Sequence, residues 1–447
     1  MMLRVSIMRA WVTAVTLSLQ ATLSLANDNP VAVTRANSPS PDMVNMDSVL
    51  LGRDLFYDPI LSGNRNIACS TCHHPRFGSG DGMSLSLGEG GIGLGPDRVI
   101  LRGAEPHARI PRNAPALWNL GEKEFTVMFH DGRVEIDETA PFGIKMPAGR
   151  ELERALPSAL AAQTILPLQS PDEMSGQSGE NPVADAVAAD HIRGPGGAWD
   201  LLARRIESLP EYRARFYALN GNQPLHITDI AMVLADFISV EFSAKQSPYD
   251  AFLMGNSGAL TDAQKRGLAL FQDKAGCAAC HSGTFQTDHG FHAIGVPQIG
   301  PGKQPNMAGY ADRGRQYVSG DPDDRYRFRT PSLRNIALTA PYGHSGAYPT
   351  LEAMLRHHLN PMEGLMRYNR AQVRLHSVNF DADDWGALED QEELLNIAEG
   401  IELPPITLTD AEIADLLSFL NALTDTESDK TRLGVPETVP SNLPVEN

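Results

Sequence analysis

The chain has 447 residues, 42% of them hydrophobic and 21% charged, which suits one large globular domain or two to three medium ones. Its formal net charge of −18 argues against binding to nucleic acid or to anionic membranes, because like charges repel. An acidic surface of this kind would instead suit a basic or dipolar protein partner.

The first 26 residues have the features of a secretory signal peptide. Arg4 and Arg9 lie beside an apolar run, and small residues lead to a predicted cleavage after Ala26. The run is too short to span a bilayer comfortably, and no other stretch is a candidate span. An uncleaved amphipathic anchor is the alternative. We therefore expect an exported, periplasmic protein with no membrane span after signal cleavage, followed by a flexible leader at 27–48.

Helical periodicity predicts a mainly α protein whose helices are separated by long loops. Helices are expected at 47–56, 151–166, 198–218, 226–242, 260–272, 350–359 and 409–423. Two Gly-rich stretches, 57–125 and 282–330, cannot build a core by themselves and are expected to wrap something else. No strand pattern is convincing, and residues 426–447 are predicted to be a flexible tail.

Two Cys-x-x-Cys-His motifs use every cysteine of the chain. They comprise Cys69, Cys72 and His73, and Cys277, Cys280 and His281. This motif is typical of covalent haem attachment, in which both thiols bond to the haem and the histidine binds its iron. A zinc site would need the two pairs close together in the chain, a thioredoxin-like pair would need a βαβ setting, and disulfides would leave the histidines unexplained.

The order of helix, motif and Gly-rich loop occurs twice and indicates a duplicated domain. We expect an N-terminal haem domain at 49–245 and a C-terminal haem domain at 246–425. Two haems allow electron transfer alone or catalysis with peroxide. Catalysis needs an iron with a vacant position and a group that moves a proton, and Glu173 is an acidic residue with apolar flanks.

Several motifs in order resemble the bacterial di-haem cytochrome c peroxidase and MauG family. They are "LGRDLFYDPILS", "CSTCH", "RNAPALWN", "FHDGR", "AAQTILPLQSPDEM", "GCAACHSGTF", "FRTPSLRNIALTAPYGHSG" and "TLEAMLRHHLNP". The resemblance covers nearly all of residues 49–424. It implies two mostly helical cytochrome c-like domains with one haem c each, a calcium ion between them and a peroxide site at the N-terminal haem.

The resemblance also assigns roles to residues. His73 would be the proximal iron ligand of the peroxide site, and Gln163, Pro167 and Glu173 match the distal pocket, with Glu173 as the acid/base. Asn113, through its side-chain oxygen, and Thr339 and Pro341, through their carbonyl oxygens, match the calcium ligands. From the sequence alone, Pro167 and Asn113 would be turn residues and Gln163 a solvated helix residue.

Two departures from the family pattern affect function. Peroxidases that need reductive activation carry a histidine that blocks the N-terminal iron, and Glu89 occupies that position here. No histidine lies between His74 and His107. The tryptophan between the two haems is replaced by His130, and Trp118 is a possible substitute. Because Glu89 replaces the blocking histidine, the N-terminal iron is expected to be open, as in the MauG branch.

Adjacent histidines near the end of the 350–359 helix raise the question of a metal ligand. On a 3.6-residue period His358 shares the apolar face of Leu351 and Leu355, whereas His357 points about 100° away. His358 also matches the family position that supplies the sixth ligand of the C-terminal iron. We expect His281 and His358 to bind that iron, with His357 outside its shell and Met354 and Met362 as fallback ligands.

The resulting prediction is an exported di-haem peroxidase that reacts with hydrogen peroxide at the N-terminal haem. It would oxidise a periplasmic redox protein by electron transfer, or modify side chains of a protein substrate as MauG-like enzymes do. The alternative is a non-enzymatic di-haem electron-transfer cytochrome. The set of Gln163, Pro167 and Glu173 argues against that alternative, because a carrier needs no acid/base for peroxide.

Overall fold

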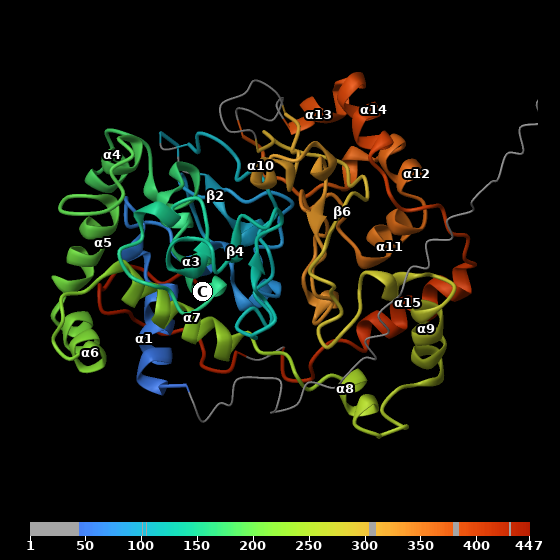
Figure 1. Ribbon diagram of the computed structural model, residues 1–447, viewed down its shortest axis with the longest axis horizontal. Coiled ribbons are helices and arrows are strands. Elements are labelled where there is room, and N and C mark those ends of the chain that lie inside the picture. The colour runs from blue at the N-terminus through green and yellow to red at the C-terminus, as the bar shows by residue number, and fades with distance from the viewer. Residues whose placement is uncertain (1–43, 101, 104, 304–309, 379–383, 429–430) are drawn as a thin grey trace, which may run out of the picture.

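The computed structural model describes residues 44–100, 102–103, 105–303, 310–378, 384–428 and 431–447. The predicted signal peptide and the leader up to residue 43 lie outside the described residues. Figure 1 shows two lobes side by side, a blue-to-green lobe from the first half of the chain and a yellow-to-red lobe from the second. Within the described ranges, no helix is long and apolar enough to cross a membrane.

Helices dominate both lobes, which confirms the mainly α fold class. The first lobe contains α1 Met46–Tyr57, α2 Cys69–Cys72, α3 Ala159–Thr164, α4 Pro182–Ala188, α5 Ala198–Glu207, α6 Pro210–Asn220 and α7 Ile227–Glu241. The second lobe contains α8 Pro248–Leu253, α9 Asp262–Gln272, α10 Gln316–Ser319, α11 Leu351–Leu359, α12 Pro361–Met366, α13 Gly386–Glu389, α14 Gln391–Glu399 and α15 Asp410–Asn421.

Short antiparallel strands, which the sequence did not predict, lie in the loop-rich regions. They are β1 Gly91–Ile92 with β2 Val99–Ile100, then β3 Val127–Met128, β4 Val134–Ile136 and β5 Ile144–Lys145 in one sheet, and β6 Phe291–His292 with β7 Phe328–Arg329. In the second sheet Val127 faces Glu135, and Glu135 faces Lys145. Strands of two or three residues are too short to show the alternation by which a strand is recognised.

The same helix pair organises each lobe. α1 packs on α7 in the first lobe, and α9 packs on α15 in the second. In both pairs a glycine permits close approach, because a Cβ on Gly52 would lie 1.8 Å from the Val233 carbonyl oxygen and a Cβ on Gly267 would lie 2.0 Å from that of Asp415. α1 and α9 each precede a Cys-x-x-Cys-His motif.

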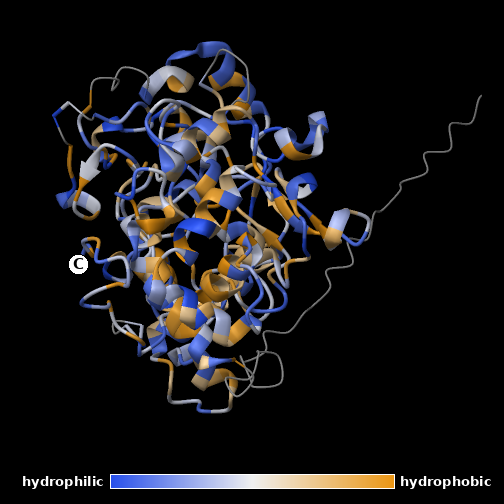
Figure 2. Cartoon of the chain, turned by 90° about the vertical axis from the view of Figure 1, so that its left-hand side faces the viewer, coloured by the Kyte–Doolittle hydropathy of each residue, from blue (hydrophilic) through white to orange (hydrophobic). Residues whose placement is uncertain are grey.

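Apolar side chains fill the space between the helices of the first lobe. Figure 2, which views this lobe from its outer side, shows the orange hydrophobic segments gathered toward the middle. Leu51 and Leu55 of α1 and Phe237 of α7 are fully buried there. Burial of such side chains is the main favourable term in folding. This core holds the helices that carry the first haem motif and Gln163.

Helix starts were predicted better than helix lengths. Thr261 and Thr409 cap α9 and α15 through their side chains, as expected. The helix predicted at 151–166 is wrong in its first half, because α3 begins only after Ser158, whose side chain accepts a hydrogen bond from the Ala161 amide. The helix predicted at 198–218 is two helices, since Pro210 lacks an N–H and begins α6 at its first turn.

Residues 431–447 are not the flexible tail that their composition predicted. In Figure 1 this red segment crosses to the first lobe, where the C label lies. Val439 is buried in the core of that lobe, and Leu433 packs against it. Glu446 accepts hydrogen bonds from Thr71 Oγ1 at 3.0 Å and from the Gly93 amide at 2.7 Å. The segment forms no helix, but it ties the first haem motif to the Gly-rich loop.

Candidate functional site

The two motif histidines have the same local geometry. His73 Nδ1 lies 3.0 Å from the Ser79 carbonyl oxygen, and His281 Nδ1 lies 3.1 Å from that of Gln286. Because a carbonyl oxygen can only accept, the proton of each ring belongs on Nδ1. The Nε2 lone pair of each histidine is then available for a metal, which is the arrangement usual for metal-bound imidazole.

The four cysteines are free thiols set beside these histidines. None of them forms a disulfide. Burial raises the pKa of Cys69 and of Cys72 to about 12 and that of Cys277 to about 11. Covalent attachment of haem takes two thiols next to one free imidazole, and each motif places its two cysteines beside such a histidine.

Cys280 also belongs to a group of possible metal ligands with Asp288 and His292. Their ligand atoms all lie within 4.8 Å of one another. Hydrogen bonds to Asp288 and then to Cys280 raise the pKa of His292 to about 10. Haem attachment would use the Cys280 sulfur, and this cluster would then belong to the second haem site.

His358 faces His281 across a gap that fits a metal ion. Their ring centres lie 6.4 Å apart with an angle of 56° between the ring planes. Two metal–imidazole bonds of about 2 Å, plus the ring radius on each side, give a separation of about 6 Å. His358 Nδ1 lies 3.0 Å from the Met354 carbonyl oxygen, so its Nε2 is free as well. Two imidazoles can therefore hold one iron in the second lobe.

His357 is satisfied by protein groups. Its Nδ1 lies 2.8 Å from the Tyr348 hydroxyl, and its Nε2 lies 2.8 Å from the Ile294 carbonyl oxygen. Burial lowers the pKa of His357 to about 3. With both nitrogens engaged, His357 has no lone pair left for iron. Met362 is 47% exposed on α12, which argues against its role as a fallback ligand.

The residues that match the distal pocket lie on α3 and on the two turns that follow it. Gln163 is buried on α3, and its Oε1 has no hydrogen-bond partner among the described residues. Pro167 begins a 3₁₀ turn, and Glu173 sits half-buried in a π-helical turn over Pro171–Ser175. Three effects raise the pKa of Cys72: burial is the largest, the charge of Asp81 comes next, and the charge of Glu173 is smaller. Glu173 therefore lies within electrostatic range of the haem motif.

Glu89 is fixed by two asparagines. Its Oε2 accepts hydrogen bonds from Asn66 at 2.5 Å and from Asn64 at 3.3 Å, whereas its Oε1 is buried without a partner in the described structure. Burial raises the pKa of the Glu89 carboxyl, and the hydrogen bond from Asn66 opposes this. A Cβ on the preceding Gly88 would lie 2.0 Å from the Asp172 carbonyl oxygen, so this loop packs tightly on the turn that carries Glu173.

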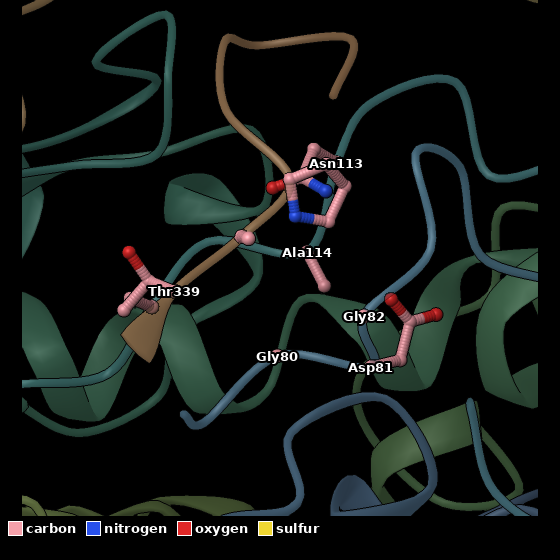
Figure 3. A pocket seen from close by; sticks show the side chains of 9 residues that line it. Gly80, Asp81, Gly82, Asn113, Ala114 and Thr339 are labelled. Atoms are coloured by element: carbon pink, nitrogen blue, oxygen red, sulfur yellow. The ribbon is translucent and has the colours of Figure 1, made fainter. Parts of the chain in front are cut away.

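The predicted calcium residues line one small cavity between the lobes. Its lining is Gly80, Asp81, Gly82, Asn113, Ala114, Ala116, Thr339, Ala340 and Pro341, and its free volume is about 10 Å³, close to that of one water or ion. Figure 3 shows how Asp81, Asn113 and Thr339 come to it from three separate segments. Asn113 Nδ2 donates a hydrogen bond to the Met83 carbonyl oxygen at 2.9 Å, which leaves the Asn113 Oδ1 available as a ligand for a cation.

His130 is half-buried at the contact between the lobes. Its Nε2 lies 3.1 Å from the Asn113 carbonyl oxygen, and its own carbonyl oxygen accepts a hydrogen bond from the Arg329 amide at 2.7 Å. Burial, reinforced by the charge of Arg112, lowers the pKa of His130 to about 4. Trp118 lies elsewhere, in the core of the first lobe, where its Nε1 donates to the Gly78 carbonyl oxygen at 3.0 Å.

Sequence reasoning missed several groups around these sites. Arg112 forms a buried ion pair with Asp131 at 2.6 Å and another with Asp312 at 2.6 Å, which joins the two lobes next to His130. Asp81 lines the small cavity, and Tyr348 bonds to His357. Charged residues are rarely buried unless they are paired. The sequence does not show which arginine pairs with which carboxylate when the two lie 200 residues apart in the chain, as Arg112 and Asp312 do.

Comparison with known proteins points to one family. Residues 46–258 match the family model described as di-haem cytochrome c peroxidase. The chain is 28% identical to the methylamine utilization protein MauG of Methylorubrum extorquens over 386 residues, 86% of this chain and 80% of that protein. It is 26% identical to the cytochrome-c peroxidase IdrP1 of Pseudomonas sp. strain SCT over 89% of this chain and 85% of that protein.

Solved structures agree with the sequence relatives. A MauG-like protein associated with microbial copper homeostasis superposes with a TM-score of 0.57 at 26% identity, covering 91% of this chain and 97% of that one. The di-haem peroxidase BthA of Burkholderia thailandensis superposes with the same TM-score at 21% identity, covering 90% of this chain and 93% of that one. The second likeness shows the fold alone.

Proposed function

Because the chain belongs to the di-haem cytochrome c peroxidase and MauG family of oxidoreductases, we propose that it is an exported peroxidase whose N-terminal haem reacts with hydrogen peroxide. Cys69 and Cys72 would hold that haem, and His73 would bind its iron. When bound there, the haem would supply the iron chemistry that reacts with peroxide.

The difference between the two lobes is the observation that carries this proposal. In the second lobe the ring centres of His281 and His358 lie 6.4 Å apart, and these two imidazoles would hold one iron between them. In the first lobe the position that the resemblance matches to a blocking histidine is Glu89, which is held by Asn66 and Asn64. The site in the first lobe therefore suits binding of peroxide, and the site in the second lobe suits electron storage or relay.

Glu173 has the chemistry and the freedom to move a proton. Within the described residues its side chain makes no hydrogen bond or ion pair, unlike that of Asp172, whose carboxylate accepts from Gln177 at 3.1 Å. We assign to the Glu173 carboxylate the transfer of the proton from the near peroxide oxygen to the far one, which leaves as water. Gln163, with its buried and unpartnered Oε1, would orient the peroxide, and Pro167 would shape the wall of the pocket.

The electrons for peroxide reduction would pass through the second haem, held by Cys277 and Cys280. The donor would be either a periplasmic redox protein or side chains of a protein substrate, as the two kinds of named relatives indicate. The net charge of −18 suits a partner with a basic contact surface.

The test is rapid mixing of the oxidised holoprotein with hydrogen peroxide. Loss of a positioned acid/base costs about 10²–10⁴-fold in rate, so Glu173→Gln should slow the haem spectral change by that factor while haem content stays the same. Asp172→Asn is the matched control and should react at the wild-type rate. A wild-type protein that shows no spectral change with peroxide would instead support the non-enzymatic electron-transfer cytochrome.

We also propose that the small cavity between the lobes binds calcium. Calcium prefers oxygen ligands, and Asn113 Oδ1 with the carbonyl oxygens of Thr339 and Pro341 would provide them, completed by water. Asp81 in the same lining adds negative charge. Titration of chelator-treated holoprotein with calcium should show one site whose affinity falls in Asn113→Ala. Equal binding by the variant would contradict the assignment.

A further inference from the structure

The proposed reaction needs a proton donor besides Glu173. Reduction of one hydrogen peroxide to two waters consumes two electrons and two protons. The proton that Glu173 would move comes from peroxide itself, so Glu173 supplies neither of the two. Both must come from solvent, and an acid of the first lobe must pass them on.

Glu89 lies between the first haem motif and the turn that carries Glu173. On one side its carboxylate accepts a hydrogen bond from Asn66, in the segment that leads into the haem motif. On the other side a Cβ on Gly88 would lie 2.0 Å from the Asp172 carbonyl oxygen and 2.8 Å from that of Glu173. The backbone beside Glu89 is therefore in direct contact with the turn of the proposed acid/base.

Arg98 fixes the same loop from a third direction. Its Nη2 donates a hydrogen bond to the Gly88 carbonyl oxygen at 2.7 Å. Burial raises the pKa of Cys72 and of Glu89, and the charge of Arg98 opposes burial at both groups. One guanidinium thus lies within electrostatic range of a cysteine of the haem motif and of the Glu89 carboxyl.

The Glu89 carboxyl has one oxygen engaged and one free. Its Oε2 accepts hydrogen bonds from Asn66 Nδ2 at 2.5 Å and from Asn64 Nδ2 at 3.3 Å. The Asn64 amide is itself oriented, because its Oδ1 accepts from Asn181 Nδ2 at 2.8 Å. Oε1 is buried and has no partner within the described ranges. Since two amides occupy the lone pairs of Oε2, a proton on Glu89 belongs on Oε1.

The surroundings favour the protonated form of this carboxyl. Burial is the largest effect on the pKa of Glu89 and raises it, and the charge of Glu180 raises it further. The hydrogen bonds from Asn66 and Asn64 and the charge of Arg98 oppose this rise without cancelling it. Glu89 therefore keeps its proton to a higher pH than a free glutamate does.

Glu180 connects Glu89 with solvent. Its Oε2 accepts from the same Asn64 Nδ2, at 2.8 Å, so the two carboxylates converge on one amide nitrogen. The Glu180 side chain is 40% exposed, and its Oε1 lies 4.0 Å from Nε2 of His107, which is 62% exposed. A proton that solvent delivers to Glu180 is then one amide group away from Glu89.

We propose that Glu89 is the proton donor of the first haem site, an inference that rests on the proposed reaction with peroxide. Its Oε1 gives a proton to the oxygen that becomes the second water, and the accompanying electron comes from the protein partner. The Glu89 carboxylate that remains takes up a new proton from solvent past Glu180. Two such cycles supply both protons and restore the Glu89 carboxyl.

The kinetic experiment mixes oxidised holoprotein with one equivalent of hydrogen peroxide and then with saturating ascorbate. Glu89→Gln keeps the size and the acceptor oxygen of the side chain but has no proton to give. Its haem spectrum should change with peroxide at the wild-type rate, because Glu173 is intact. The return to the resting spectrum should be about 10²–10⁴-fold slower at unchanged haem content. Asp172→Asn, which removes a neighbouring carboxyl, should match the wild type in both steps.

Infrared difference spectroscopy of the resting holoprotein measures the proton itself, without peroxide. Wild type minus Glu89→Gln should show the carbonyl stretch of a protonated carboxyl, shifted in D₂O. The band should disappear as the pH rises, because the carboxyl then becomes a carboxylate. Glu89→Asp keeps an acid at this position and should retain the band and part of the rate.

Two results would overturn Glu89 as the donor. One is a Glu89→Gln variant that returns to the resting spectrum at the wild-type rate. The other is a difference spectrum without a protonated-carboxyl band at the pH of turnover. A wild-type protein whose haem spectrum does not change with peroxide would be a separate failure, because it would refute the reaction itself while leaving the infrared band of Glu89 in place.

Discussion

Glu446 offers the sharpest test of how residues 431–447 hold the first lobe together. Its carboxylate accepts hydrogen bonds from Thr71 in the haem motif and from the Gly93 amide in the Gly-rich loop, and it lies 3.7 Å from the Arg98 guanidinium. The side chains of Glu446 and Arg98 are only 19% and 4% exposed. Solvent therefore screens these interactions weakly.

Glu446→Gln removes the charge and leaves one oxygen to accept one of the two hydrogen bonds. A hydrogen bond to a charged group contributes about 1.5–3 kcal/mol, and a buried donor left without a partner costs about 1–3 kcal/mol. The substitution should thus lower the free energy of unfolding of the first lobe by about 2.5–6 kcal/mol. Hydrogen exchange should also become faster in residues 88–98, because the loop loses its tie to the haem motif.

Denaturant unfolding and hydrogen exchange of the holoprotein would measure these effects. Glu437→Gln is the matched control, because Glu437 lies exposed in the same segment and the chemical change is identical. The reasoning is refuted if the two variants unfold at the same denaturant concentration and if residues 88–98 exchange hydrogen at the same rate in both. The contacts of Glu446 would then contribute nothing.

The remaining predictions concern the second lobe and the junction. His358→Ala should abolish the low-spin signal of the second haem, whereas His357→Ala should keep that signal. The reverse outcome would make His357 the ligand. A low-spin signal that survives in both variants would place the ligand elsewhere. Burial acts to raise the pKa of Asp312, but the charge of Arg112 and its hydrogen bond together outweigh burial and lower that pKa. The stabilisation is therefore complete above the carboxyl's unfolded value of about 3.9 and is lost as the pH falls below it. Asp312→Asn should therefore lose about 3–5 kcal/mol at pH 7 and show a flatter acid-unfolding profile by circular dichroism.

Local sequence signals predicted the parts of this molecule that depend on nearby residues. The two Cys-x-x-Cys-His motifs and the caps Thr261 and Thr409 are read from spacings of two or three residues. The periodicity of residues 350–359 separated His358 from His357, although it could not show that His357 is the more deeply buried of the two.

Long-range contacts explain what the sequence could not predict. The tail looked flexible because its composition is polar and Pro-rich, yet Glu446 meets Thr71 from 375 residues away. The partner of His357, Ile294, lies 63 residues from it in the chain. No local pattern encodes such contacts, because they form only when the lobes are folded.

In the proposed enzyme the first haem has one protein ligand and the second has two. Electron paramagnetic resonance of the resting, oxidised holoprotein measures this directly, before any reductant is added. We predict one high-spin haem, held by His73, and one low-spin haem, held by His281 and His358. Two low-spin haems in the resting state would contradict the account, because a sixth ligand would then block the proposed peroxide site.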